Sequence, residues 1–456
     1  MSFPRYPEYK DSGVKWLGQV PVHWGIRPLK YVATYNDEVM PEGTPNDYPI
    51  KYVEISDVDE QLGITGWTEY PFASAPSRAR RVLKDGDVLI STVRTYLRAI
   101  APVTEPPDGL VGSTGFAVIR PVPYIYHSAL LGYVIRAEWF ISSIISRSAG
   151  VSYPAINASD LVALSLPVPP WKDQQTIATF LDHETAKIDT LIHEQKRLIE
   201  LLKEKRQAVI SHAVTKGLNP DVPMKDSGVE WLGEVPEHWQ VCRAAVIYSE
   251  VAEKGVAELP VLRVSIHHGV SDKELNEEES DRKITRIQDR EKYKRVRPGD
   301  LVYNMMRAWQ GGFGAVLVDG LVSPAYVIAR PKSEDISRYV EQLLRTNCAV
   351  EEMRKNSYGI TDFRLRLYWG QFKNIRVCVP PEPERQEIMD QLDTLRKNSE
   401  KLQNEAKKTV SILQERRSAL ITAAVTGKID IRNWQPPVDK STQASKSPQR
   451  NEELLS

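Results

Sequence analysis

The sequence has few of the features that place a protein outside the cell or in a membrane. Its three cysteines, Cys242, Cys348 and Cys378, are widely spaced and odd in number, which fits neither a disulfide framework nor a zinc site. No apolar run approaches the ~18 residues that a membrane-spanning helix needs. Residues 1–9 are polar and contain two prolines, unlike a signal peptide. We therefore expect a protein of a reducing cytoplasm.

Catalytic motifs are also missing. The pair Gly427-Lys428 is followed by Ile429, so it does not complete a phosphate-binding loop. None of the four Pro-Pro pairs lies in the Asp/Asn-Pro-Pro-aromatic string of adenine methyltransferases. His267 and His268 have no further ligands at metal spacing, which favours a structural or solvent-exposed role. These absences favour a binding protein that is not an enzyme and holds no metal or cofactor.

Charge is balanced over the whole chain but segregated locally. The 456 residues suffice for two or more domains, and their formal net charge is zero. However, residues 78–98 contain six basic and two acidic side chains, and residues 281–297 contain eight basic and three acidic ones. Each cluster fits either a nucleic-acid contact or a solvated loop, and the sequence leaves both interpretations open.

The chain contains one unit twice. Residues 10–24 (KDSGVKWLGQVPVHW) return as residues 225–239 (KDSGVEWLGEVPEHW), with 12 of 15 positions identical. Shorter matches follow in the same order, including KDGDVLI with RPGDLVY and EKRQAVISHAVTKG with ERRSALITAAVTGK. Residues 26–81 and 240–295 share little visible similarity. Such a duplication predicts pseudo-two-fold symmetry and two similar binding functions in one chain.

Each copy ends in a long predicted helix. Residues 173–216 and 384–426 contain neither glycine nor proline, with prolines before each run and a glycine directly after it. A continuous helix of this length would reach about 65 Å. The duplication suggests that the two helices pack against each other antiparallel.

The apolar residues of these helices follow a 3.5-residue repeat, which predicts a coiled-coil seam. In the first helix the repeat selects Ile177, Leu181, Ile188, Leu191, Leu198, Leu202 and Val209. In the second it selects Ile388, Leu392, Leu395, Leu402, Ala406, Leu413, Leu420 and Ala423.

The remaining sequence predicts strand-rich domains. Short alternating runs bounded by turn residues are typical of strands, and they occur at residues 48–57, 87–92, 116–120, 259–266, 300–304 and 326–329. The predicted class is therefore α+β, with two strand-rich globular domains separated by two long helices in an antiparallel coiled coil. The expected domains are residues 1–170, 171–217 (first helix), 218–381, 382–430 (second helix) and a disordered tail at 431–456.

The doubled pattern resembles the DNA-specificity subunits of type I restriction–modification systems. The resemblance is carried by VPVHW and VPEHW, by LPVPPWKDQQTIATFLD and IRVCVPPEPERQEIMDQLD before the helices, and by AVTKG and AVTGK after them. It covers roughly residues 4–431. Each motif is weak alone, whereas the doubled order is specific.

The resemblance implies a non-catalytic subunit with two target-recognition domains, each binding one half of a split, asymmetric DNA sequence across a gap set by the helices. It implies two methyltransferase subunits and added restriction subunits as partners, in a bacterial or archaeal cytoplasm. S-adenosylmethionine, ATP and magnesium would then belong to the partners and not to this chain.

Loop position and side-chain chemistry indicate the candidate DNA contacts, because arginine and lysine bind phosphates or guanine, amides pair with adenine and aromatic rings stack on bases. In the first domain they are Arg78, Arg80, Arg81, Arg94, Tyr96, Arg98, Ser152, Tyr153 and Asn157. In the second they are Arg282, Lys283, Arg286, Arg307, Trp309, Tyr358, Arg364 and Arg366. An exposed or ion-paired role is the alternative for each.

Two other functions remain open from the sequence alone. One is a self-contained DNA nuclease or methyltransferase, which the missing motifs disfavour. The other is a coiled-coil scaffold with two protein-binding domains. Steep weakening of DNA binding by salt would distinguish the favoured interpretation from a scaffold.

Overall fold

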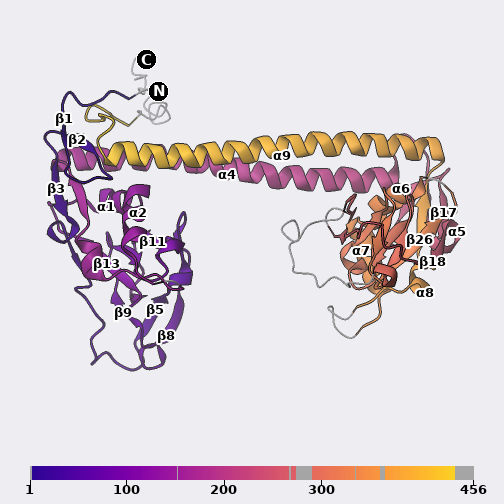
Figure 1. Cartoon of the computed structure of the whole chain (residues 1–456), viewed down its shortest axis with the longest axis horizontal. Helices are drawn as coiled ribbons and strands as arrows, with labels where there is room; N and C mark the ends of the chain where they lie inside the picture. Colours follow the sequence, from indigo (N-terminus) through magenta and orange to yellow (C-terminus); the bar gives the residue numbers. More distant parts are fainter. Residues whose placement is uncertain are drawn as a thin grey trace, which may run out of the picture. The chain divides into compact units, whose positions relative to one another are not determined.

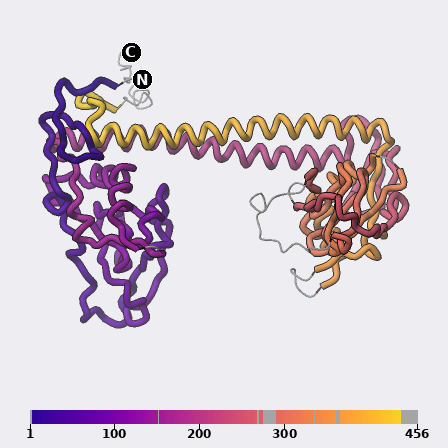
Figure 2. The backbone as a smooth tube through the Cα atoms, in the orientation of Figure 1, coloured from indigo at the N-terminus to yellow at the C-terminus, as the bar shows by residue number. Residues whose placement is uncertain are grey.

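In the computed structural model the chain forms two compact units, each containing an α+β domain and part of both long helices (Figures 1 and 2). Unit 1 comprises Met1–Gln195 with Lys408–Ser456, and unit 2 comprises Lys196–Lys407. The structure describes residues 3–150, 152–266, 269–273, 290–333, 335–359 and 365–436. The predicted α+β class, with strand-rich domains and long helices, is confirmed.

The domain of unit 1 contains two four-stranded sheets. The first has the order β11-β10-β13-β4, all antiparallel, with bounds Ile100–Pro102, Val88–Ser91, Phe116–Pro121 and Ala33–Tyr35. The second has the order β8-β5-β12-β9, in which β5 and β12 are parallel, with bounds Thr68–Pro71, Pro49–Val53, Leu110–Ser113 and Ala79–Val82. Helices α1 (Ser128–Ile135), α2 (Glu138–Arg147) and α3 (Ala158–Val162) complete it.

The domain of unit 2 is built the same way. Its first sheet has the order β18-β26-β23-β24, with bounds Tyr248–Val251, Tyr326–Pro331, Leu301–Asn304 and Phe313–Ala315. Its second sheet has the order β19-β22-β25, with bounds Glu253–Lys254, Lys294–Val296 and Gly320–Val322. The helices are α5 (Ala244–Ile247), α6 (Ile336–Leu344), α7 (Asn347–Lys355) and α8 (Trp369–Phe372).

The first sheets of the two domains share one strand order, although parts of their sequences show no similarity. The strand orders β11-β10-β13-β4 and β24-β23-β26-β18 correspond one to one. In unit 1 the hairpin of β6 (Val58–Asp59) and β7 (Gly63–Ile64) packs beside β11. In unit 2 the hairpin of β20 (Val264–Ser265) and β21 (Gly269–Val270) packs beside β24. The divergent segments therefore place an equivalent hairpin beside the first sheet of each domain.

The repeated motifs form the frame that holds each domain to the helices. They pair β1 (Tyr9–Asp11) with β2 (Gln19–Pro21), β3 (Gly25–Pro28) with β14 (Ser165–Val168), β15 (Met224–Asp226) with β16 (Glu234–Pro236) and β17 (Gln240–Arg243) with β27 (Arg376–Val379). Trp24 and Trp239 are buried in the two main cores. The neighbouring histidines bind the first turn of a long helix, His23 through Asp173 at 3.2 Å and His238 through Glu384 at 2.6 Å. A packing role for both histidines agrees with these contacts.

The long helices are α4 (Trp171–Lys216) and α9 (Glu382–Val425). The glycine after each, Gly217 or Gly427, has a positive φ of 80° or 71°, which ends a helix at little steric cost. In unit 1 the start of α4 shares a core with the end of α9, through Leu181 and Ile421 among others. In unit 2 the end of α4 shares a core with the start of α9, through Val214 and Ile388. The helices therefore run antiparallel.

The predicted seam is wrong at four of its fifteen positions. Leu191, Leu198, Val209 and Leu402 are 50%, 42%, 40% and 49% exposed, whereas Thr185, Ile192, Ile199, Ser399 and Gln403 are buried. In α4 the pairs Leu191-Ile192 and Leu198-Ile199 offer two adjacent apolar side chains, so a periodic template cannot tell which one faces the partner helix. The packing selects the second residue of each pair.

Part of the predicted disordered tail is packed. Ile431 is buried, and Trp434 contacts Phe180 of α4 edge-to-face, with ring centroids 5.3 Å apart. Asp430 N–H donates to the Pro4 carbonyl at 2.8 Å, so the segment joins the N-terminal strand region. Trp434 makes an apolar contact that the mostly polar composition of the tail did not predict. Residues 437–456 lie outside the described part of the chain.

Candidate nucleic-acid interface

In unit 1 an exposed loop follows β10 directly. It contains a short 3₁₀ helix, η4 (Thr95–Leu97), between Arg94 and Arg98, whose φ angles of 49° and 52° are left-handed. This conformation costs a non-glycine residue about 1–2 kcal/mol and occurs preferentially at functional sites. Tyr96 and Leu97 are 52% and 49% exposed. The backbone therefore presents two large side chains to solvent.

A second loop lies beside η4. Val93 and Ala155 form an isolated antiparallel bridge, and Ile156 N–H donates to the Thr92 carbonyl at 2.9 Å. The Arg94 guanidinium lies 4.7 Å from the centre of the Tyr153 ring, which is 65% exposed. The structure thus brings Arg94, Tyr96 and Tyr153 together from segments about 60 residues apart in the chain. Such a mixture of cation and aromatic rings suits phosphates and base faces.

Ser152 and Asn157 belong to the same loop. Both are exposed, and Asn157 directly precedes α3. Its amide lies 3.5 Å from an Asp160 carboxylate oxygen, a long contact that leaves the amide accessible.

The arginines before and within β9 differ from one another. Arg78 is exposed, and its carbonyl accepts from Thr114 N–H at 2.8 Å, next to Gly115, to which Thr92 N–H donates. Arg78 therefore adjoins the η4 loop. Arg80 lies 5.6 Å from the Phe72 ring, and burial lowers the pKa of Arg81. Of the three, Arg78 is the one best placed for a phosphate.

Arg98 is partly buried and ion-paired. Its guanidinium donates to both carboxylate oxygens of Glu138 at 2.8 Å and to Glu60 at 3.0 Å. These hydrogen bonds, first of all those to Glu138, raise its pKa. Arg98 thus forms an ionic bridge between η4, the β6–β7 hairpin and α2, which corresponds to the ion-paired alternative, and its DNA contact stays a prediction.

The loop after β23 of unit 2 occupies the same topological position. Its 3₁₀ helix η6 (Ala308–Gln310) contains Trp309, and the Arg354 guanidinium lies 5.8 Å from the Trp309 ring. Arg307 donates to the Gln310 side chain at 2.7 Å. Tyr358, which is 64% exposed, exchanges two backbone hydrogen bonds of 2.9 Å with Arg366. Leu367 N–H donates to Met305, which draws this loop toward η6.

Four predicted residues, Arg282, Lys283, Arg286 and Arg364, lie outside the described residues. Conversely, sequence reasoning missed Leu62 and Arg354. Leu62 is 79% exposed in a polar turn, and the available signal was a leucine directly after the polar run Asp59-Glu60-Gln61. Arg354 carries no local signal, because only folding brings α7 against η6.

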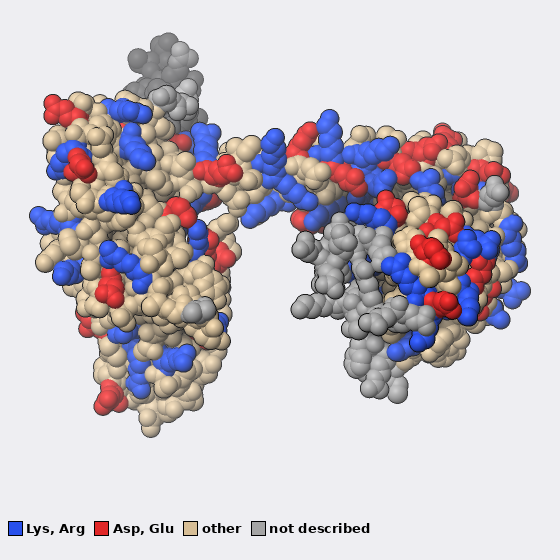
Figure 3. All heavy atoms as spheres, in the orientation of Figure 1, with Lys and Arg blue, Asp and Glu red and all other residues tan. Residues whose placement is uncertain are grey.

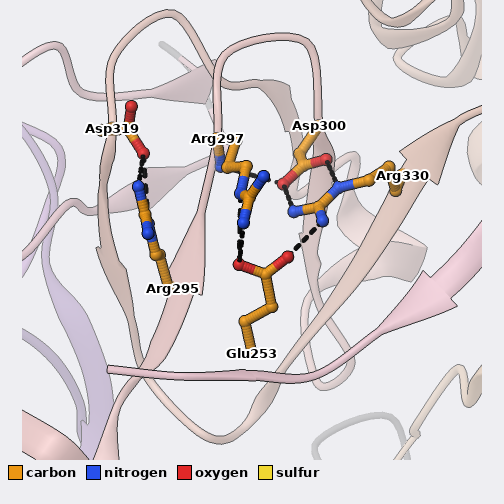
Figure 4. Close-up of polar contacts among 6 residues, drawn as sticks. All are labelled: Glu253, Arg295, Arg297, Asp300, Asp319 and Arg330. Carbon is orange, nitrogen blue, oxygen red and sulfur yellow. Dashed lines mark hydrogen bonds and ion pairs between the residues drawn. The ribbon is translucent and has the colours of Figure 1, made fainter. Parts of the chain in front are cut away.

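Buried ion pairs hold the strands that carry both loops. Asp87, just before β10, accepts from Arg120 of β13 at 2.7 and 2.8 Å and from Lys84 N–H at 2.8 Å. Asp300, just before β23, accepts from Arg330 of β26 twice at 2.9 Å and from Arg297 N–H at 2.9 Å. Glu253 extends the second cluster by accepting from Arg297 and Arg330, and Asp319 accepts from Arg295 (Figure 4). These arginines are structural.

Charge on the described surface is mixed. In the view of Figure 3, basic and acidic side chains alternate over both units. Within the described ranges no group of three or more histidine, cysteine or acidic residues is arranged to hold a metal ion. Also among these residues, no single helix is long and apolar enough to cross a membrane. The bent pair α1–α2, which passes that test by length and composition, lies largely in the unit 1 core.

The comparisons with known proteins agree with one another. Residues 77–201 match the family described as the type I restriction modification DNA specificity domain. The type I restriction enzyme EcoKI specificity subunit of Escherichia coli is 23% identical over 68% of this chain and 68% of its own length. The protein described as the MjaX specificity subunit of Methanocaldococcus jannaschii is 26% identical over 51% of this chain. That alignment spans only 55% of the relative's length.

Solved structures show the same fold. A chain from a study of complex assembly and conformational transition of the type I R-M system superposes with a TM-score of 0.67, at 20% identity, over 89% of this chain and 98% of the other. The HsdS subunit of Thermoanaerobacter tengcongensis superposes with a TM-score of 0.52, at 21% identity, over 90% of this chain and 98% of the other. In its motifs, its duplicated topology and these matches, the chain is similar to the DNA-specificity subunits of type I restriction–modification systems.

Proposed function

We propose that this chain is the non-catalytic specificity subunit of a type I restriction–modification complex and that it binds a bipartite, asymmetric double-stranded DNA sequence. Each domain binds one half-site, and α4 and α9 set the gap between them. The frame docks two adenine-methyltransferase subunits and, with them, restriction subunits. The partner subunits, and not this chain, bind S-adenosylmethionine, ATP and magnesium. The complex works in a bacterial or archaeal cytoplasm.

One observation carries this proposal. The loops at η4 and η6 occupy the same topological position in the two domains, yet their side chains differ. Tyr153 and Tyr358 have matching exposures of 65% and 64%, whereas Tyr96 and Leu97 of the first loop correspond in position to Trp309 and Gln310 of the second. Equivalent positions with unlike side chains suit two unlike half-sites.

Two domains in one chain make recognition selective. A wrong base pair costs a recognition domain about 1–3 kcal/mol, and penalties at separated positions add. One domain alone discriminates over few base pairs. When two domains are held on one frame, the losses of binding free energy at both half-sites add. DNA whose half-sites are separated by the wrong gap is also bound less well.

The test pairs one substitution in each domain. The chain is assembled with its methyltransferase, and methylated sites in cellular DNA are mapped by sequencing. Tyr153→Ala should relax or weaken recognition of one half-site only, and Tyr358→Ala of the other only. Each variant is the control for the other, because both remove an equally exposed tyrosine.

The same complex is then titrated with the mapped duplex at several NaCl concentrations. Binding should weaken steeply with salt because phosphate contacts release counterions. Absence of any sequence-specific DNA binding by the complex would contradict the proposal and favour a protein-binding scaffold. Methyl transfer by the purified chain alone would contradict the non-catalytic assignment.

A further inference from the structure

Leu62 projects from the tip of the β6–β7 hairpin and is 79% exposed. The tip is well defined, since Asp59 accepts backbone N–H groups from Gln61 at 2.7 Å and from Leu62 at 2.8 Å. The hairpin also packs beside β11. A large apolar side chain on a structured tip is presented to a partner at little further cost in conformational entropy.

Arg98 joins this tip to the η4 loop. It bonds Glu60, two residues before Leu62, and it follows Leu97 directly in the chain. Its second partner, Glu138, is the first residue of α2, so the joint is anchored to the domain core. Arg98 thus links the exposed Leu62 of the hairpin to the exposed Tyr96 and Leu97 of the η4 loop, and these three side chains are hereafter called the apolar ridge. Clustered exposed apolar groups mark interaction surfaces more reliably than single ones.

The electrostatics of the ridge do not suit phosphate. The charge of Arg98 is compensated by Glu60 and Glu138, two carboxylates that would repel a phosphate. Exposed cations lie to the side instead, at Arg94, which contacts Tyr153, and at Arg78. An apolar centre flanked by cations is complementary to duplex DNA, in which stacked bases lie between two lines of phosphates.

From this arrangement we infer that the apolar ridge is a wedge that inserts at a base-pair step of the first half-site and unstacks it. The inference rests on the proposed function and deepens it, because it states how one domain engages DNA. Apolar side chains that enter a step partly unstack it and bend the duplex. Such a domain senses how easily a step deforms, in addition to its hydrogen-bonding pattern.

The experiment uses the assembled complex with its methyltransferase and the duplex mapped by methylation sequencing, with 2-aminopurine placed in turn at each step of the first half-site. Wild type should raise 2-aminopurine fluorescence at one step. Leu62→Ala with Leu97→Ala should abolish that rise and weaken binding about tenfold, the size of a lost stacking contact. The dependence of affinity on salt should not change, because no phosphate contact is removed.

Two variants provide controls. Leu317→Ala removes a 58% exposed leucine in the turn after β24 of the other unit and should leave both readouts unchanged. Leu62→Phe keeps a large apolar tip and should retain the fluorescence rise. Thermal unfolding of each variant checks that the fold is kept.

A mismatch placed at the affected step sharpens the test, because a pre-unstacked step costs less to open. On the mismatched duplex, the loss of DNA affinity caused by Leu62→Ala with Leu97→Ala should then shrink to about twofold or less. The wedge is excluded if wild type leaves every step stacked, or if the double variant weakens methyltransferase assembly and not DNA binding. Failure of the proposed function looks different, since the wild-type complex would then not select the mapped duplex at all.

Discussion

Arginines of this protein differ in role according to the charges around them. Arg78 and Arg94 are exposed beside the η4 loop, whereas Arg98, only four residues after Arg94, is surrounded by Glu60 and Glu138. A guanidinium that already shares its charge with two carboxylates gains little from a phosphate. Residue type and loop position alone therefore do not distinguish the exposed arginines from the ion-paired one.

The first prediction tests this difference by salt dependence. Arg78→Ala should lower the slope of log affinity against log salt by about 0.9, the value for one lost phosphate contact. Arg98→Ala should not lower the slope, because no phosphate contact is lost. The measurement is fluorescence anisotropy of the assembled complex with its mapped duplex between low and moderate NaCl. Equal losses of slope in both variants would show that Arg98 also contacts phosphate.

At the scale of elements, the strand that carries each candidate loop is held by a buried aspartate. Asp87 and Asp300 are almost inaccessible to solvent, and each accepts two hydrogen bonds from an arginine of the neighbouring strand. Hydrogen bonding to Asp87 and to Asp300 raises the pKa of Arg120 and of Arg330 above the ordinary value. The GD motif that the repeat preserves is thus a structural anchor.

The second prediction concerns this anchor. Asp300→Asn should lower the free energy of unfolding of the chain by about 2–4 kcal/mol, because one partner of a buried pair is lost. This loss of free energy of unfolding is smaller than for a fully buried pair, because the Arg330 side chain is 27% accessible. Chemical denaturation followed by circular dichroism measures it. A loss below about 1 kcal/mol would mean that the turn, and not the ion pair, holds the strand.

The third prediction concerns Glu253 and pH. Hydrogen bonding from Arg330 lowers the pKa of Glu253 below its ordinary value of 4.5. An acid whose pKa is depressed by folding adds stability that is complete above its unfolded pKa and is lost as the pH falls through the folded one. Wild type should therefore exceed Glu253→Gln in stability by up to about 1 kcal/mol at neutral pH.

This difference should shrink as the pH falls below the ordinary pKa of 4.5 and close below the depressed pKa of the folded state. Denaturation midpoints measured between pH 3 and pH 7 provide the check. A difference that stays constant with pH would instead point to a packing effect of the substitution.

The divergent segments of the two domains contain equivalent hairpins despite their unlike sequences. Residues 26–81 and 240–295 share little sequence, yet both contain a hairpin that packs beside the equivalent strand, β11 or β24. Strand pairing depends on alternating burial and backbone hydrogen bonds, which many sequences satisfy. Sequence comparison within the chain therefore missed an equivalence that the sheet order makes plain.

At the scale of the whole molecule, the duplicated unit and the antiparallel helices are two aspects of one symmetry. Each compact unit contains one domain with the start of one long helix and the end of the other. Asp189 of α4 and Arg417 of α9 form an ion pair at 2.8 Å in unit 1, which marks one matched level along the helices. This ion pair shows which residues of the two helices lie side by side, so equal insertions next to it would lengthen both helices by the same amount.

The fourth prediction uses that level. Inserting one heptad between residues 190 and 191 and another between residues 415 and 416 lengthens both helices by about 10 Å. The preferred gap between half-sites should grow by about three base pairs, because B-DNA rises about 3.4 Å per pair. Sequencing of methylated sites measures both the gap and the half-sites.

Insertion into α4 alone serves as the matched control and should destabilise the pair of helices without defining a new gap. The idea that helix length sets the gap would be wrong if the paired insertion changed the half-sites themselves.

The sequence by itself determined the duplication, the α+β class and the presence and approximate ends of α4 and α9, because helix boundaries and repeats depend on local residue identity. Only the tertiary structure decided the seam register, the packing of Trp434, the partners of Arg98 and the place of Leu62 beside η4. The adjacent apolar pairs of α4 are equivalent until a partner helix covers one of them. Likewise, Arg98 meets Glu60 and Glu138 only after folding brings together residues some 40 positions apart in the chain.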